Sequence, residues 1–188
     1  RLAMAIAALS EIAHVRIIRI HTRAPAAAPE LVTPERIAAL HANDATVYVA
    51  VHANHSRELT GAAHAACRAL ADAGIPLLGQ SVLLKGVNDH VETLADLMRA
   101  FVALRIKPYY LHHPDLAPGT AHFRLPIDEG QRLYEALCAR ISGLARPAYV
   151  LDIPGGVSKA PLTPAYLREG ASGRQVLSAA GDWLDYRG

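Results

Sequence analysis

The sequence has few cysteines and no dense run of basic residues. Its two cysteines, Cys67 and Cys138, lie far apart on the faces of predicted helices, where buried free thiols are common. They predict no disulfide framework and indicate a reducing compartment, so we expect a cytoplasmic protein. The net charge of +2, without a Lys/Arg cluster, gives no support for a nucleic-acid partner.

Long apolar runs are missing as well. The apolar stretches are too short and too often interrupted to span a bilayer, and residues 1–8 lack the features of a secretory signal. We therefore expect no membrane partner. The 188-residue chain, with 52% apolar residues, is long enough for one domain with a sizeable core. Because it starts without Met and enters a helix at once, we expect it to be the remainder of a longer protein.

Helical and strand patterns alternate along most of the chain. Helices are predicted over residues 1–14, 33–40, 60–73, 88–104 and 126–143, and strands over residues 15–20, 46–51, 75–84, 107–111 and 148–153. This alternation indicates a parallel sheet with right-handed crossovers. An Ala/Pro loop is expected at residues 24–29, and residues 166–186 predict small antiparallel strands joined by glycine turns. In the helix over 88–104, the spacing of Leu94, Leu97, Met98 and Phe101 predicts an inward face.

Polar side chains gather where the predicted strands end. They are His21, Arg23, His52, Asn54, His55, Gln80, Tyr109, Tyr110, His112, His113, Asp115, Asp152 and Lys159. All except Gln80, which lies inside its run, stand at or just after a carboxyl end, where function collects in parallel α/β folds. If the strands are neighbours, all these groups surround one mouth.

Several of these groups also have simpler explanations. His52 and His55 could cap a loop, and without a third ligand nearby they predict no metal site. Tyr109 and Tyr110 should point to opposite faces of their strand, so that one packs and the other faces the mouth. A ring that faces the mouth could stack on a planar cofactor.

Two acids and a lysine carry the chemistry that we favour. Asp115 and Asp152 can act as acid and base or clamp an ammonium group, and we favour the clamp because sugar-binding aromatics are not evident. Asp115 could also be a turn residue. The segment Asp152-Ile-Pro-Gly-Gly-Val-Ser-Lys159 lacks P-loop spacing. Lys159 could be a phosphate contact or a solvated loop charge, but a Schiff-base lysine fits best, because a sheltered amine can act as a nucleophile.

Four segments resemble the lysine 2,3-aminomutases. They are residues 74–89 (GIPLLGQSVLLKGVND), 107–115 (KPYYLHHPD), 121–124 (AHFR) and 152–162 (DIPGGVSKAPL). The resemblance runs from the N-terminal helix to about Tyr166. It implies an α/β fold in which residues 1–160 form the carboxyl-terminal part of an incomplete TIM-type barrel of a radical S-adenosylmethionine enzyme. Residues 161–188 would form a short β-rich tail.

The resemblance also implies cofactors and the residues that hold them. Lys159 corresponds to the lysine that is linked to pyridoxal phosphate, and Tyr109 to a tyrosine beside the cofactor ring. Gln80 and a histidine of the pair His52 and His55 correspond to residues near S-adenosylmethionine.

The same resemblance implies a substrate. Asp115 and Asp152 correspond to the acids that hold the side-chain ammonium group of lysine. In the related glutamate mutases these acids are replaced, so keeping both favours a cationic substrate. The implied isomerase moves the α-amino group of L-lysine to the β-carbon, through a 5′-deoxyadenosyl radical and a radical on a pyridoxal phosphate aldimine. A homo-oligomer and a place in the elongation factor P pathway are left open.

The sequence departs from the family at several places. The Cys-x3-Cys-x2-Cys motif is absent, so the ligands of the [4Fe–4S] cluster and the basic residues for phosphate and carboxylate are expected upstream of Arg1. We therefore expect these 188 residues alone to be inactive. His90 stands where some members have a zinc-binding cysteine, so no zinc is predicted. One alternative is a non-catalytic remnant that binds pyridoxal phosphate or a partner. Another is an ordinary pyridoxal phosphate or class I aldolase-type enzyme.

Overall fold

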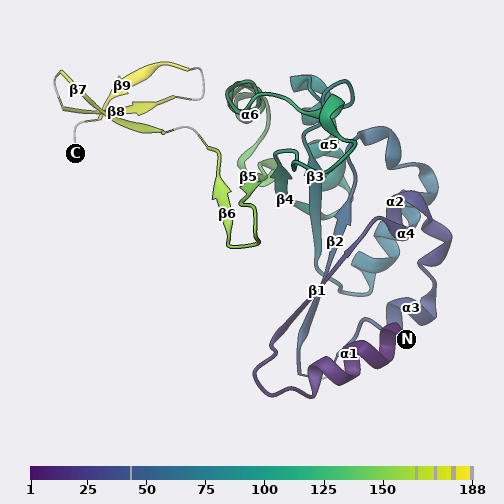
Figure 1. Ribbon diagram of the computed structural model, residues 1–188. Coiled ribbons are helices and arrows are strands. Elements are labelled where there is room, and N and C mark those ends of the chain that lie inside the picture. The colour runs from purple at the N-terminus through teal and green to yellow at the C-terminus, as the bar shows by residue number, and fades with distance from the viewer. Residues whose placement is uncertain (43, 164, 172, 179–180, 187–188) are drawn as a thin grey trace.

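A curved sheet of six strands forms the body of the molecule (Figure 1). The computed structural model describes residues 1–42, 44–163, 165–171, 173–178 and 181–186. The strands lie in the order in which they occur in the chain: β1 (Ile17–Thr22), β2 (Thr46–His52), β3 (Leu77–Val82), β4 (Ile106–His112), β5 (Ala148–Asp152) and β6 (Lys159–Pro161). Neighbours from β1 to β5 pair in parallel, and β6 returns antiparallel to β5.

Helices cover the convex face of the sheet and leave the concave face open (Figure 1). The α-helices are α1 (Leu2–Ser10), α2 (Ala24–Ala27), α3 (Pro34–Ala38), α4 (Gly61–Asp72), α5 (Val91–Ala103) and α6 (Ile127–Arg140). Short 3-10 turns lie at Pro29–Leu31, Ser56–Glu58, Ala121–Phe123 and Gly143–Ala145. The predicted incomplete barrel with outer helices is therefore confirmed.

The core lies between this sheet and its helices. Alternate residues of β2 face the helices, and Val47, Val49 and Val51 are buried while His52 is only partly so. From α5, the predicted inward residues Leu94, Leu97, Met98 and Phe101 are all buried. Because one face of each strand makes the core, the polar residues at alternate positions are left on the concave face.

Some predicted elements were wrong in detail. The first helix ends at Ser10, and the segment expected to be a loop contains α2 and a 3-10 turn. Pro25 lies in the first turn of α2, where a missing N–H costs nothing, and Thr22 Oγ accepts a hydrogen bond from Ala24 N–H at 3.0 Å. The Ala/Pro composition therefore favours a short helix as well as it favours a loop.

The tail forms a second sheet of three antiparallel strands. They are β7 (Leu167–Gly170), β8 (Gly173–Leu177) and β9 (Trp183–Asp185), as the glycine-separated runs predicted. The guanidinium of Arg168 lies 4.2 Å from the centroid of the Trp183 ring. Residues 164, 172, 179–180 and 187–188 of the predicted tail lie outside the described residues.

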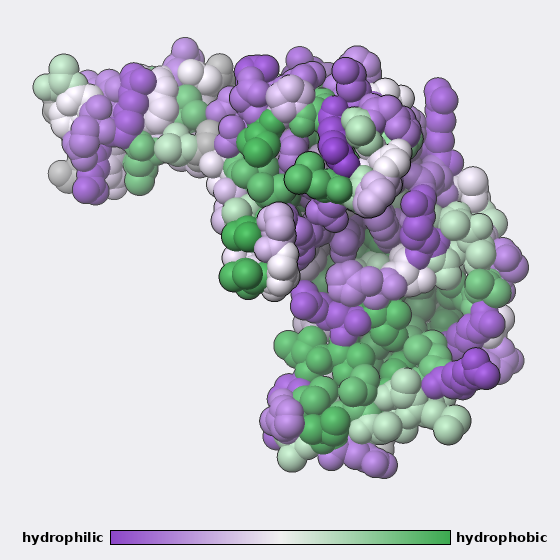
Figure 2. All heavy atoms as spheres, viewed as in Figure 1, coloured by the Kyte–Doolittle hydropathy of each residue, from purple (hydrophilic) through white to green (hydrophobic). Residues whose placement is uncertain are grey.

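Apolar side chains are exposed where the sheet begins. Met4 of α1 is 74% exposed and Ile17 of the edge strand β1 is 60% exposed. Figure 2 shows hydrophobic atoms gathered over this part of the molecule, where α1 and the first residues of β1 and β2 lie. Across the described residues, each helix is too short or too polar to cross a bilayer.

Candidate functional site

Polar side chains of β1, β2 and β3 meet on the concave face. His21 Nδ1 lies 2.9 Å from Gln80 Oε1, although β2 separates their strands in the sheet. A cavity of about 150 Å³ opens beside them and is also lined by Arg23 and His52. The structure therefore brings Gln80 and His52, two of the residues predicted to lie near S-adenosylmethionine, to the walls of one cavity.

His52 is held in a defined orientation by Asn54. Its Nε2 lies 3.2 Å from Asn54 Oδ1, which also accepts a hydrogen bond from Val82 N–H at 2.9 Å. Because an amide oxygen only accepts, Nε2 of His52 carries the hydrogen. Burial and the positive charge of Arg23 lower the pKa of His52, so the imidazole is neutral at pH 7. Its Nδ1 is then left as an acceptor.

His55 has a different place from His52. Its Nδ1 accepts a hydrogen bond from Arg57 N–H at 3.1 Å and so caps the 3-10 turn Ser56–Glu58. Glu58 Oε1 in turn accepts from the N–H groups of Asn54 and His55, at 2.7 and 3.0 Å. The geometry of His55 is that of a loop cap, and His55 does not line the cavity that holds His52.

Tyr109 and Tyr110 lie on the same face of β4, and the expectation of opposite faces was wrong. The β3–β4 register skips Tyr109, because Gly79 pairs with Pro108 and Gln80 pairs with Tyr110. Such a β-bulge inserts one residue and turns two successive side chains to one side. The two ring centroids are 3.9 Å apart and the hydroxyl oxygens are 3.1 Å apart. Arg19 of β1 donates to the Tyr109 hydroxyl at 3.4 Å.

Lys159 lies on a strand rather than in a loop. Pro154, Gly155 and Gly156 turn the chain, and the two glycines have φ of +88° and +72°, which favour glycine. The chain then returns as β6, where Lys159 is the register partner of Asp152. The Lys159 ammonium forms an ion pair with Asp152 Oδ1 and lies 5.5 Å from the centroid of the Tyr110 ring.

Asp152 has a second partner on β4. Its Oδ2 lies 2.9 Å from Nδ1 of His112, a buried residue. Burial raises the pKa of Asp152, but the hydrogen bonds from Lys159 and His112 and the positive charge of Lys159 outweigh it, so the pKa is below its usual value. Asp152 is therefore a carboxylate at neutral pH.

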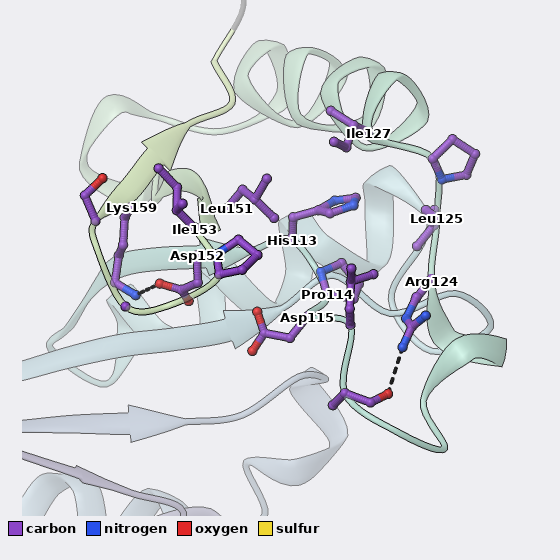
Figure 3. A pocket seen from close by; sticks show the side chains of 16 residues that line it. His113, Pro114, Asp115, Arg124, Leu125, Ile127, Leu151, Asp152, Ile153 and Lys159 are labelled. Atoms are coloured by element: carbon purple, nitrogen blue, oxygen red, sulfur yellow. Dashed lines mark hydrogen bonds and ion pairs between the residues drawn. The ribbon is translucent and has the colours of Figure 1, made fainter.

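A cavity of about 1000 Å³ adjoins this hairpin. Figure 3 shows Lys159, Asp152 and Asp115 along its wall, with the Asp115 side chain pointing into the space below Asp152. Asp115 is exposed and stands in the loop after β4. Arg124 braces this loop from the opposite side, since it donates to the Ala117 carbonyl at 2.7 Å. The structure thus brings the predicted lysine and both predicted acids to one cavity.

The residues present can hold some of the implied cofactors. Lys159 and the cavity of about 1000 Å³ beside it fit pyridoxal phosphate together with an amino acid. The Tyr110 ring lies 5.5 Å from the Lys159 amine, although neither Tyr109 nor Tyr110 lines this cavity. His52, Gln80 and a cavity of about 150 Å³ fit contacts with a part of S-adenosylmethionine. The size of this second cavity is too small for the whole molecule.

The cysteines do not fit an iron–sulfur cluster. Cys67 is fully buried on α4, and Cys138 is buried on α6, away from both cavities that carry the predicted site residues. Burial raises the pKa of the Cys67 thiol to about 11, whereas a cluster requires thiolates. Among the described residues, groups of three His, Cys, Asp or Glu that could hold a metal ion are absent.

Two contacts at the site were missed by sequence reasoning. Tyr110 and His112 belong to the polar set at the strand ends, but neither had been given a role. The structure places the Tyr110 ring 5.5 Å from the Lys159 amine and makes His112 the second partner of Asp152. Alternation along β4 could have placed His112 on the concave face, but its pairing with Asp152 depends on the β4–β5 register.

The comparisons with known proteins agree with the resemblance. The chain is 43% identical over 162 residues to the L-lysine 2,3-aminomutase of Clostridium subterminale, which covers 86% of the chain and 39% of that relative. It is 38% identical over 159 residues to the glutamate 2,3-aminomutase of Clostridioides difficile, covering 85% and 37%. The chain thus spans about two fifths of the length of these relatives. The predicted resemblance to lysine 2,3-aminomutases is confirmed, and the partial coverage is consistent with a carboxyl-terminal portion.

The fold has a counterpart among solved structures. A radical SAM methyltransferase from Sphaerobacter thermophilus matches with a TM-score of 0.55 and 21% identity, over 75% of this chain and 42% of that one. At this identity the likeness shows the fold alone, and it supports the incomplete barrel. No protein-family model matches the chain.

Proposed function

We propose that this chain, a homologue of the lysine 2,3-aminomutases over most of its length, is the carboxyl-terminal part of an isomerase that acts on L-lysine. The observation that carries the proposal is the meeting of Lys159, Asp152 and Asp115 at one cavity of about 1000 Å³. The enzyme would move the α-amino group of L-lysine to the β-carbon. Residues 1–160 would contribute the barrel strands and residues 161–188 the tail, in a cytoplasmic protein.

The chain's own residues would bind and orient the reactants. Pyridoxal phosphate, when bound, supplies an aldehyde for the Lys159 amine and a conjugated ring that can delocalise an unpaired electron. Tyr109 and Tyr110 would both lie beside this ring, and Tyr110, whose ring centroid is 5.5 Å from the Lys159 amine, would make the larger contact. Asp152 and Asp115 would bind the side-chain ammonium of lysine, since two carboxylates at one cavity attract a cation and repel an acidic substrate.

The concave end of β1 to β3 would serve the second cofactor. Gln80 and His52 would contact polar groups of S-adenosylmethionine, with His52 offering Nδ1 as an acceptor. His55, also predicted near this cofactor, would act through the loop it caps. The exposed apolar residues of β1 and α1 favour the packing of a further part of the protein against this edge. That part would carry the cluster ligands. A homo-oligomer and a product destined for elongation factor P are compatible with this arrangement.

A second candidate function comes from the cysteines. Because Cys67 and Cys138 do not fit a cluster, the chain could instead hold pyridoxal phosphate without radical chemistry. The sequence upstream of Arg1 separates the two candidates. A Cys-x3-Cys-x2-Cys motif in the complete reading frame supports the isomerase. If the motif is absent, the isomerase is ruled out and a protein that binds pyridoxal phosphate without radical chemistry is supported.

The direct test is turnover by the complete protein. Reconstituted without oxygen with iron, sulfide, pyridoxal phosphate and S-adenosylmethionine, it should convert L-lysine to β-lysine. Borohydride should trap pyridoxal phosphate on Lys159 in the parent protein. Lys159→Ala should lose both the trapped label and turnover, while the exposed residue Lys85, changed to Ala, should leave both intact. A protein that carries the cysteine motif and still leaves lysine unchanged would contradict the proposal.

A further inference from the structure

His112 is the buried neighbour of the substrate clamp. It is the last residue of β4, its side chain is 9% exposed, and the Tyr110 ring meets it edge-on at 5.4 Å between centroids. Its Nδ1 lies 2.9 Å from Asp152 Oδ2, across the β4–β5 pairing. A buried imidazole that contacts one oxygen of a half-exposed carboxylate restricts how that carboxylate can rotate.

The protonation state of His112 follows from its neighbours. Burial and the charge of Lys159 lower the pKa of His112, although Asp152 and Asp115 oppose this, so the imidazole is neutral at pH 7. An ionised carboxylate only accepts hydrogen bonds, so the single hydrogen lies on Nδ1 and is donated to Asp152. The other nitrogen, Nε2, is buried and lacks a hydrogen-bond partner among the described residues.

The two oxygens of Asp152 therefore have different surroundings. Oδ2 accepts from a neutral, buried donor, while Oδ1 faces the half-exposed amine of Lys159. A neutral donor fixes the carboxylate without cancelling its charge. The charge of Asp152 thus stays available to a cation at Oδ1. A second cationic partner at Oδ2 would weaken the attraction between Asp152 and that cation.

We infer that His112 is a positioning residue, which holds Asp152 Oδ2 so that Oδ1 is directed at the cation in the cavity. The inference rests on the proposed function, in which that cation is the ammonium group of lysine once Lys159 is linked to the cofactor. His112 itself does not touch the substrate. It acts only through the orientation of Asp152, so its loss should weaken lysine binding more than it slows the reaction.

The variants Leu and Asn separate positioning from packing. His112→Leu fills a similar space without a donor, and it should raise the KM for lysine about ten-fold while kcat changes less. His112→Asn places an amide N–H near the position of Nδ1, so it should restore most of the affinity. Equal KM values for the parent protein and His112→Leu would overturn the inference, as would an Asn variant no better than Leu.

NMR spectroscopy tests the hydrogen bond between His112 Nδ1 and Asp152 independently of turnover. With ¹⁵N-labelled histidine at pH 7, the His112 ring should show the neutral form with hydrogen on Nδ1, and Asp152→Asn should shift this signal. Asp152 is half-exposed, so this variant avoids the folding risk of a buried change. Hydrogen on Nε2, or a signal indifferent to Asp152→Asn, would overturn the inference even if lysine is turned over. The expected signal in a protein that leaves lysine unchanged would instead count against the proposed function alone.

Discussion

Lys159 and Asp152 stand opposite each other on the β5–β6 hairpin and form an ion pair. The same carboxylate oxygen that this pair uses is the one that the proposal assigns to the substrate. Under the proposed function, the Lys159 ammonium would occupy the place of the substrate's side-chain ammonium until Lys159 is linked to the cofactor. The proposal therefore places both the cofactor attachment and half of the substrate clamp on one hairpin.

The clamp predicts how Asp152→Asn changes catalysis. Losing the charge removes a charge-assisted hydrogen bond to the substrate ammonium, which costs about 1.5–3 kcal/mol. The KM for lysine should therefore rise about ten- to hundred-fold, while the KM for S-adenosylmethionine changes little. Steady-state kinetics of the complete protein measure both values. Asp96→Asn, an exposed change on α5, is the control, and unchanged lysine kinetics in Asp152→Asn would rule out the clamp.

The tyrosine pair predicts unequal effects on cofactor binding. The Tyr110 ring centroid lies 5.5 Å from the Lys159 amine, whereas the Tyr109 hydroxyl accepts a hydrogen bond from Arg19 of β1. An aromatic contact contributes about 0.5–1.5 kcal/mol, so Tyr110→Leu should raise the Kd for pyridoxal phosphate about two- to ten-fold. Tyr109→Leu should have the smaller effect. Absorbance titration of each variant tests this order, and a larger loss in Tyr109→Leu would reverse the assignment.

Burial of Cys67 predicts a pH dependence of stability. Its thiol has a pKa of about 11 in the folded protein against a usual value of 9.0, so below pH 9 both states keep the proton. As the pH rises from 9 towards 11, the unfolded chain loses it first, and the folded state loses stability over this window. The free energy of unfolding in urea should fall between pH 8 and pH 10.5 in the parent protein, and it should fall less in Cys67→Ala.

The same burial predicts that the cysteines are not cluster ligands. Cys67→Ala and Cys138→Ala should leave the iron content of the reconstituted complete protein unchanged. Both thiols should react with a thiol reagent only after denaturation. A loss of iron in either variant would show that the cysteine assignment is wrong.

The fold was largely predictable because it follows from periodicity. The spacing of Leu94, Leu97 and Phe101 fixes the buried face of α5 without any knowledge of the neighbouring strands. Alternation of strands and helices in turn favours a parallel sheet with right-handed crossovers. The strand ends then share one edge, so the meeting of Asp115 and Asp152 at one cavity could be expected from the sequence.

The remaining features depend on pairing rather than on local pattern. The bulge that brings Tyr109 beside Tyr110 arises from the β3–β4 register, to which the two residues themselves give no clue. The return of Lys159 as a strand depends on backbone pairing with β5, and the contact of His112 with Asp152 depends on the β4–β5 register. Sequence patterns therefore placed the groups at the site but not their partners.

Packing behind the cavity predicts that Gly130→Ala destabilises the protein. A Cβ on Gly130 of α6 would lie 2.0 Å from the hydroxyl of Tyr149, a fully buried residue. That hydroxyl cannot move freely, because it is 2.7 Å from Nδ1 of His113, which lines the cavity. Overpacking of this kind costs about 1–3 kcal/mol, so the free energy of unfolding in urea should fall by that amount.

A matched glycine distinguishes overpacking from a general effect of adding a methyl group in a helix. Gly61 begins α4, and a Cβ there would meet nothing within 4 Å. Gly61→Ala should be neutral or should stabilise the protein by up to about 1 kcal/mol, because alanine restricts the unfolded chain. The changes in the free energy of unfolding caused by Gly130→Ala and Gly61→Ala should therefore have opposite signs or differ by more than about 1 kcal/mol. Equal free energies of unfolding for Gly130→Ala and Gly61→Ala would show that Tyr149 moves aside at little cost. The hydrogen bond to His113 would then not hold the Tyr149 hydroxyl in place.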